Sequence, residues 1–349
     1  MDKAQLAALV ADGEVITNVS LAGLDLSGAV LAGATFDHVS FAGANLDGAS
    51  FKESTLSSCD LSDARLSGAN LHHTILYRCN LARAALGGAK MIDARMAEVS
   101  APGAVMTGAD LSLATFLDSD LTDAVLAPVV LDRTNFITTK VSRIDLSGTR
   151  INRSILLKAD LTDAKLDGVQ FDNAILIDGR LAGRDLSGMD FTLAQFMGAD
   201  LSECVFAGAT LTQCNFKDSN LARAVLTGVK AKNCLFYGAK LGGAKLDRAD
   251  VFQGIFIEAD LSGADCSGAS MQQSIFHDAK CVGTLFSGAD LTYADFSRAD
   301  LTAAVFSDAK LFRARFHRTI EDRTVFSSRV TALGDDVDLA EAETWQSPY

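Results

Sequence analysis

Apolar residues recur at every fifth position along most of this chain. From Leu21 to Phe316 every fifth residue is apolar, which gives 60 consecutive pentapeptides without an insertion or a deletion. Of the 60 central residues, 32 are Leu and 17 are Phe, and in 56 pentapeptides the residue two places earlier is Ala, Ser, Thr, Cys, Val or Gly. A period of five fits neither a helix nor a long strand. It fits a short strand followed by a corner, so the pattern predicts a solenoid whose central residues point inward.

Glycine indicates how many pentapeptides make one coil. Two places after the central residue, Gly fills twelve of fifteen positions that are 20 residues apart, from Gly28 to Gly288. One corner in every four therefore favours a residue without a Cβ atom. We expect coils of four pentapeptides, square in section, and about fifteen such coils from the 60 repeats.

The two ends of the chain depart from the repeat. Residues 1–18 are expected to form a helical cap, with Asp2 as the N-cap and Gly13 ending the helix. Residues 319–349 are expected to form a C-terminal cap and an acidic tail with a short helix, and we expect Trp345 and Tyr349 to fold back onto the last coil. The sequence thus predicts three parts: a cap (1–18), a β-helix (19–318), and a second cap with its tail (319–349).

One coil inside the repeat carries unusual residues. Arg184 and Met189 occupy positions that are otherwise kept for small residues. A guanidinium among inward Ala side chains is costly unless it bonds to backbone carbonyls or turns outward. We expect a local splay of this coil, and a functional kink is the alternative.

The repeated Ala-Asp-Leu units, such as residues 109–113 and 159–163, resemble those of the pentapeptide repeat family. The resemblance covers about 300 of the 349 residues. It implies the family fold, an all-β solenoid that forms a right-handed quadrilateral β-helix with Leu and Phe stacked inside.

Composition and charge exclude several classes of function. The net charge of −13 is opposite in sign to that of the usual nucleic-acid binder, and no segment has the length of a membrane span. All seven Cys fall at inward positions, so we expect buried thiols and a reducing compartment, here the cytoplasm. The five His are expected to point outward, and only His72 and His73 are adjacent, which is a weak signal for a metal. Without a phosphate-binding loop or a catalytic constellation, we expect a non-enzyme with no metal and no cofactor.

Two sides of the predicted coil differ in their outward residues. The side centred on Leu21 and every twentieth residue after it, called the ladder face, alternates in charge from coil to coil. Because stacked strands lie about 4.8 Å apart, neighbouring opposite charges neutralise each other, and we interpret the ladder as structural. The alternation is clearest in the run Asp120, Lys140, Asp160 and Arg180.

The side centred on Phe36 and every twentieth residue after it, called the stripe face, is rich in outward apolar residues. Its outward positions hold 14 large apolar residues in 30 slots, against one on the ladder face. β-Propensity alone would act on all four sides equally, so we interpret the excess as an interaction surface. The stripe residues expected to bind a partner are Ile137, Ile155, Leu157, Ile175, Ile177, Leu235, Tyr237, Ile255, Ile257 and Ile275.

Two functions remain open. We favour a rigid scaffold that binds a protein partner, or a second copy as a homodimer, through the stripe face, without direct contact to nucleic acid or membrane. The resemblance implies the alternative, because some pentapeptide repeat proteins are acidic rods that imitate DNA, bind DNA gyrase and protect it from quinolones or gyrase poisons. Residues 21–316 hold 34 acidic and 27 basic residues, and their obvious acidic rows are compensated, so we rank this alternative second.

Overall fold

In the computed structural model, which describes residues 1–345, the five-residue register sets which side chains point inward. Central residues such as Leu21, Phe116 and Phe256 are fully buried. The residue two places after the centre has a positive φ whether it is Gly28 (62°) or Asp123 (58°). Such left-handed residues turn the chain between successive short strands. The predicted core and corners are therefore confirmed.

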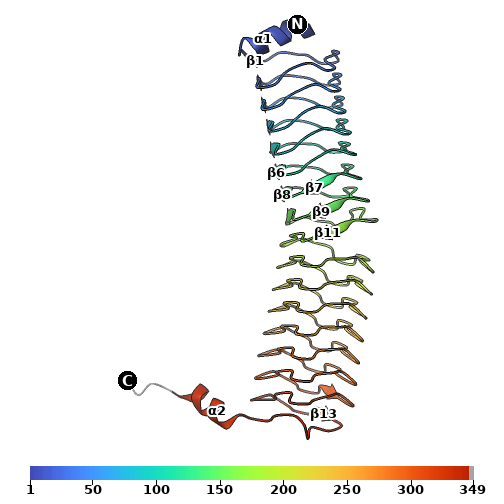
Figure 1. The fold of residues 1–349 in the computed structure, drawn as a ribbon, viewed down its shortest axis with the longest axis vertical. Coiled ribbons are helices and arrows are strands. Elements are labelled where there is room, and N and C mark those ends of the chain that lie inside the picture. The colour runs from blue at the N-terminus through green and yellow to red at the C-terminus, as the bar shows by residue number, and fades with distance from the viewer. Residues whose placement is uncertain (346–349) are drawn as a thin grey trace. The chain divides into compact units, whose positions relative to one another are not determined.

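The chain divides after Arg180 into two compact units, called unit 1 (from Met1) and unit 2 (from Leu181). Each unit consists of stacked coils (Figure 1), in which a residue pairs in parallel with the residue 20 places later. Asn45 pairs with Arg65 in unit 1, and Lys240 pairs with Asp260 in unit 2. The predicted fold class, an all-β solenoid of the quadrilateral β-helix type with an N-terminal helical cap, is confirmed.

Unit 1 begins with helix α1 (Lys3–Ala11), which covers the first coil (Figure 1). Its N-cap Asp2 accepts the Gln5 N–H at 2.9 Å, and its Leu6 is fully buried. Parallel strands on the stripe face form one sheet in the order β1 (Val15–Thr17), β2 (Thr35–Asp37), β3 (Thr55–Ser57), β4 (Ile75–Tyr77), β5 (Arg95–Ala97), β6 (Thr115–Leu117), β8 (Asn135–Ile137) and β10 (Ile155–Leu157). The adjacent side carries a smaller sheet in the order β11 (Gln170–Asp172), β9 (Arg150–Asn152) and β7 (Val130–Asp132).

Unit 2 has the same coil length but fewer extended residues. Single parallel bridges such as Leu235 to Ile255 join most of its coils, and β12 (Val305–Phe306) pairs with β13 (Val325–Phe326) near its end. Behind the stripe face, seven Phe rings from Phe196 to Phe316 stack with neighbouring centroids 4.5 to 5.3 Å apart. The predicted C-terminal helix is present as α2 (Val337–Thr344).

Two expectations about single residues are wrong. His317 occupies an outward position on its coil but is fully buried, because the backbone N–H of Asp336 and the side chain of Glu343 lie against its ring. Trp345 is 71% exposed and does not fold back, while the same expectation for Tyr349 lies outside the described residues. Arg184, at its unusual inward position, is only half-buried.

Candidate interaction surfaces

The Asp residues that precede many of the central residues have a structural role. Asp110 Oδ1 accepts the Ser112 backbone N–H at 3.0 Å and the Ser112 hydroxyl at 2.6 Å. Between coils, Asn80 Nδ2 donates to Asp60 Oδ1 at 3.0 Å. The two bonds of Asp110 close the corner after its strand, as an Asx turn does, and the Asn80 bond joins neighbouring coils. Carboxylates at this position of the repeat are therefore used by the fold.

Opposite charges stack on the outer surface of unit 1 as predicted. On the ladder face, Arg180 Nη1 lies 2.9 Å from Asp160 Oδ2, and Lys140 Nζ lies 3.8 Å from Asp120 Oδ2. At a corner, Arg143 Nη2 lies 2.6 Å from Asp123 Oδ2. The hydrogen bonds from Arg143 hold the pKa of Asp123 below its usual value. These rows of carboxylates are therefore neutralised by their neighbours.

All seven Cys are buried free thiols. Cys204 Sγ donates to the Leu181 carbonyl at 3.0 Å, the bond that Ser and Thr make at equivalent positions. Burial raises the pKa of Cys204 to about 11, which keeps it a neutral thiol. A hydrogen bond with the Cys79 thiol lowers the pKa of Cys59, but both side chains are only 1% exposed. The expected packing role of the Cys residues is borne out.

The adjacent His72 and His73 have ring centroids 3.9 Å apart, and His73 Nδ1 lies 2.8 Å from Asp93 Oδ2. Across residues 1–345, no three His, Cys, Asp or Glu side chains converge in a way that could hold a metal ion. None of the helices in that range has the length and apolar character needed to span a bilayer.

The unit 1 stripe consists of Ile137, Ile155, Leu157, Ile175 and Ile177, all half-buried. Ile137 is the register partner of Leu157, and Ile155 is the bridge partner of Ile175. Because paired residues on neighbouring strands lie about 5 Å apart, each side chain covers part of the next one. The structure thus places these predicted residues together in two adjacent rows.

The unit 2 stripe consists of Leu235, Tyr237, Ile255, Ile257 and Ile275, also half-buried. Leu235, Ile255 and Ile275 form one unbroken row of bridge partners. The Tyr237 ring lies 5.5 Å from Lys217 Nζ, and hydrogen bonding to Glu258 raises the pKa of its hydroxyl. The unit 2 stripe therefore ends in a polar, charged border at Tyr237.

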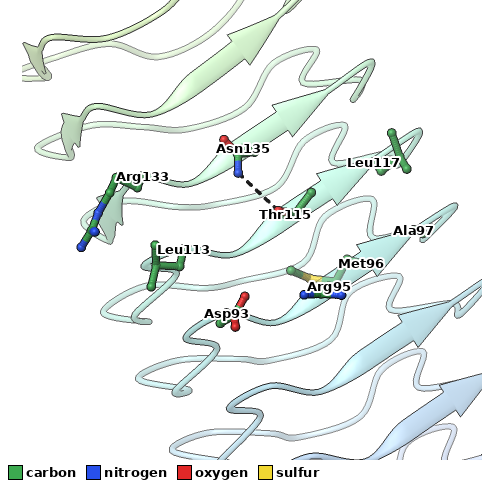
Figure 2. Close-up of a pocket in the computed structure, with 9 residues that line it drawn as sticks. All are labelled: Asp93, Arg95, Met96, Ala97, Leu113, Thr115, Leu117, Arg133 and Asn135. Atoms are coloured by element: carbon green, nitrogen blue, oxygen red, sulfur yellow. Dashed lines mark hydrogen bonds between the residues drawn. The ribbon is translucent and has the colours of Figure 1, made fainter.

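A hollow of about 580 Å³ interrupts the stripe face of unit 1 (Figure 2). It lies over Ala97 and Thr115, whose short side chains leave a gap between longer neighbours. Leu113 and Leu117 border it in the same coil as Thr115, and they are 40% and 39% exposed. The other lining residues are Asp93, Arg95, Met96, Arg133 and Asn135, and Asn135 Nδ2 donates to Thr115 Oγ1 at 3.3 Å.

Sequence reasoning did not identify the hollow as a candidate site. The position of Leu113, two places after a central residue, predicts an outward side chain at a corner, and its φ is 62°. Leu193 and Tyr293 occupy equivalent corners, so the residue type alone does not mark a site. The contributions of Arg95 and Arg133 follow only from the way the coils stack.

Several solved structures are similar to this chain. A trypsin-treated variant of QnrB1, a plasmid-mediated fluoroquinolone resistance protein, is 19% identical with a TM-score of 0.40, over 52% of this chain and 90% of that chain. HetL, a pentapeptide repeat protein involved in heterocyst differentiation regulation from the cyanobacterium Nostoc sp. strain PCC 7120, is 22% identical with a TM-score of 0.26, over 90% and 96% of the two chains. Rfr23, a pentapeptide repeat protein from the cyanobacterium Cyanothece 51142, is 15% identical with a TM-score of 0.24, over 44% and 91%.

None of the curated proteins compared with this chain matches it. The family model described as "Pentapeptide repeats (8 copies)" matches ten segments between residues 16 and 318, several of them overlapping, from 16–52 at one end to 279–318 at the other. Together these segments cover well over half of the chain and coincide with the coils described above. The chain therefore belongs to the pentapeptide repeat family.

Proposed function

We propose that this protein is a non-enzymatic scaffold that binds a protein partner, or a second copy of itself, through the stripe face. The observation that carries the proposal is the pairing of large aliphatic side chains in register on successive coils, such as Ile155 with Ile175. Side chains held this way have already lost much of their freedom, so binding costs little further entropy. A flat apolar sheet of this kind suits a partner's helix or an equivalent sheet.

The core behind the stripe supports the same function. In unit 2, the rings of Phe236, Phe256 and Phe276 stack behind the stripe with centroids 4.7 and 4.8 Å apart. A close-packed interior resists deformation, so the outward rows keep their spacing when a partner binds. Rigidity is useful for a binding surface, whereas catalysis needs converging polar groups that neither stripe provides.

The test is to introduce charged residues on the unit 1 stripe while leaving the buried core residues unchanged. The double variant Ile175→Asp with Ile177→Asp forces two carboxylates to lose water on docking, which should cost about 2–5 kcal/mol of binding free energy. The melting temperature should stay near that of the wild type, because both side chains point away from the core. The measurements are molar mass by light scattering, affinity capture of partners, and a thermal melt.

A matched control places the same charges on another side of unit 1. Val105 and Val125 are also outward bridge partners on adjacent coils, and Val105 is 39% exposed. The variant Val105→Asp with Val125→Asp should leave mass and captured partners unchanged. Identical behaviour of the two double variants would show that the stripe is only a surface of good strand formers.

Binding to DNA gyrase is the weaker candidate. DNA imitation requires rows of uncompensated carboxylates, whereas Asp63 and Asp123 each lie 2.6 Å from a stacked Arg nitrogen. We therefore expect little inhibition of gyrase supercoiling by the purified protein. Strong inhibition that disappears when surface carboxylates are neutralised would reverse this ranking.

A further inference from the structure

Helix α2 is held against unit 2 by one side only. Glu343 accepts hydrogen bonds from Arg298 Nη1 at 3.1 Å and from the ring of His317 at 3.3 Å, and it lies 2.9 Å from Arg318 Nη1. Arg318 Nη2 also donates to the Ala340 carbonyl at 2.9 Å. These contacts fix the side of α2 that carries Ala340 and Glu343.

The other side of α2, called the free side, combines large apolar residues with carboxylates. Val337, Glu341 and Trp345 follow one another at intervals of four residues, which places them in one row, with Asp338 beside it. Val337 is 67% exposed and Trp345 is 71% exposed. Within residues 1–345, none of these four side chains makes a hydrogen bond or an ion pair. The free side is therefore an acidic, apolar surface without a partner in its own unit.

The hollow in unit 1 has the complementary character. Leu113 and Leu117 give it apolar borders, Arg95 and Arg133 give it two cations, and the Asp93 carboxylate, 2.8 Å from His73 Nδ1, also lines it (Figure 2). Arg133 is paired with Asp132 at 2.9 Å. Among the residues that the structure describes, no carboxylate lies within 4.0 Å of the Arg95 guanidinium. The hollow thus offers one unpaired cation next to exposed leucine surface.

We infer that this hollow binds the free side of α2 from a second copy of the chain. Val337 and Trp345 pack on Leu113 and Leu117, while the α2 carboxylates face the arginines. Asp338 and Glu341 lie about 4.5 Å apart along the helix, so both carboxylates can approach one guanidinium, that of Arg95. Arg133 lies about two coils away from Arg95, which is about 10 Å.

The contact is heterologous, because the hollow and α2 are different surfaces. Each copy therefore keeps one free hollow and one free helix, so copies add head to tail and mass grows with concentration. The inference rests on the proposed function, since Leu117 is the register partner of Ile137 and extends the unit 1 stripe. It uses other residues, however, so the two proposals can fail separately.

The experiment is sedimentation velocity of the full chain over a concentration series, together with fluorescence of Trp345, the chain's single tryptophan. For the wild type, the sedimentation coefficient should rise and the emission should move to shorter wavelength with concentration. The hollow variant, Arg95→Glu with Arg133→Glu, should weaken association about tenfold or more, because like charges then face each other. The helix variant, Asp338→Arg with Glu341→Arg, should do the same.

A charge-matched control and a rescue make the result specific. Lys90→Glu with Arg153→Glu changes two exposed cations of unit 1 outside the hollow and should leave association unchanged. The chain that carries both the hollow and the helix substitutions restores opposite charges and should associate again. A wild type that stays monomeric, a hollow variant that associates normally, or a failed rescue overturns the inference. If only Ile175→Asp with Ile177→Asp abolishes association, the stripe proposal stands and the hollow proposal is wrong.

Discussion

The stripe face has the same repeat in both units, but the units differ in the length of their strands and in the buried row behind the face. In unit 1 its backbone forms a continuous sheet from β1 to β10, and the buried row behind it mixes residue types. In unit 2 single bridges join the coils, and the buried row is Phe throughout. The mixed row in unit 1 contains Phe36, Leu56, Leu76, Met96, Phe116, Phe136, Leu156 and Leu176.

The comparison shows that the same outward row can be supported in two ways. Backbone hydrogen bonds between coils support the row in both units, as from the Leu156 N–H to the Ile175 carbonyl in unit 1 and from the Phe236 N–H to the Ile255 carbonyl in unit 2. In unit 2 the Phe stack adds further support, with ring planes within 10° of parallel from Phe196 to Phe316. Core substitutions should therefore matter more for the surface of unit 2 than for that of unit 1.

The largest effect should come from a charge inside the unit 2 stack. Phe236→Asp places an unpaired carboxylate in a dry interior between two stacked rings, which should abolish cooperative folding of unit 2. Leu235→Asp is the control, because this neighbour points outward and should leave the melt almost unchanged. Circular dichroism melts and limited proteolysis measure both variants. Similar losses for the two would contradict the assignment of inside and outside.

A smaller loss of stability should distinguish the buried rows of the two units. Phe256 stacks on two rings, at 4.7 and 4.8 Å, whereas Phe116 stacks on one, at 5.1 Å. Each aromatic pair contributes about 0.5–1.5 kcal/mol beyond its buried area. We therefore expect Phe256→Leu to lower the free energy of unfolding by about twice as much as Phe116→Leu. Equal losses in denaturant titrations would show that stacking does not distinguish the units.

The smallest expected effect is a loss of stability at low pH. In unit 1, hydrogen bonds from Arg143 lower the pKa of Asp123, whereas in unit 2 the Ser187 hydroxyl and N–H lower that of Asp185. A carboxyl with a lowered folded-state pKa stabilises the fold above its unfolded pKa, near the ordinary 3.8. That stability disappears as the pH falls through the folded-state pKa, so melting temperatures should drop below about pH 4.

The difference between the two kinds of partner should appear in how these two carboxyl groups titrate. About 0.5 M salt, or the variant Arg143→Gln, should raise the pKa of Asp123 towards its ordinary value, because an exposed ion pair is screened. Asp185 should respond to neither, since its partners are uncharged. Carboxyl titration by NMR measures both groups in one sample, and a parallel salt response would contradict the distinction.

The core and the corners could be predicted because each depends on one residue at one position. Leu21 or Phe116 is inward for any neighbour, and Gly28 marks a corner whatever surrounds it. The burial of His317 could not be predicted, since its cover comes from an irregular segment some 20 residues later. The hollow was equally hidden, because it arises from the relative lengths of Ala97, Thr115 and their neighbours on three coils.

The identity of the stripe residues was predictable, but their degree of exposure was not. The alternation of inward and outward positions gave their direction, and bridges such as Ile155 to Ile175 give their spacing. Their half-burial results from contacts between coils. The sequence of a single pentapeptide does not show these contacts. The single-residue pattern therefore predicts where a surface faces better than how much of it a partner can reach.

The corner after every fifth residue has a consequence for how such a chain can change in length. Within a unit, the interior repeats every five residues, but the surface repeats every 20. Loss of one pentapeptide would keep each later Leu or Phe inward and move its outward neighbours to the adjacent side, whereas loss of a whole coil would keep the sides aligned. A variant lacking residues 142–146 should therefore melt cooperatively while its outer rows no longer line up. A small deletion of this kind can therefore change the binding surface of such a fold while leaving its stability almost unchanged.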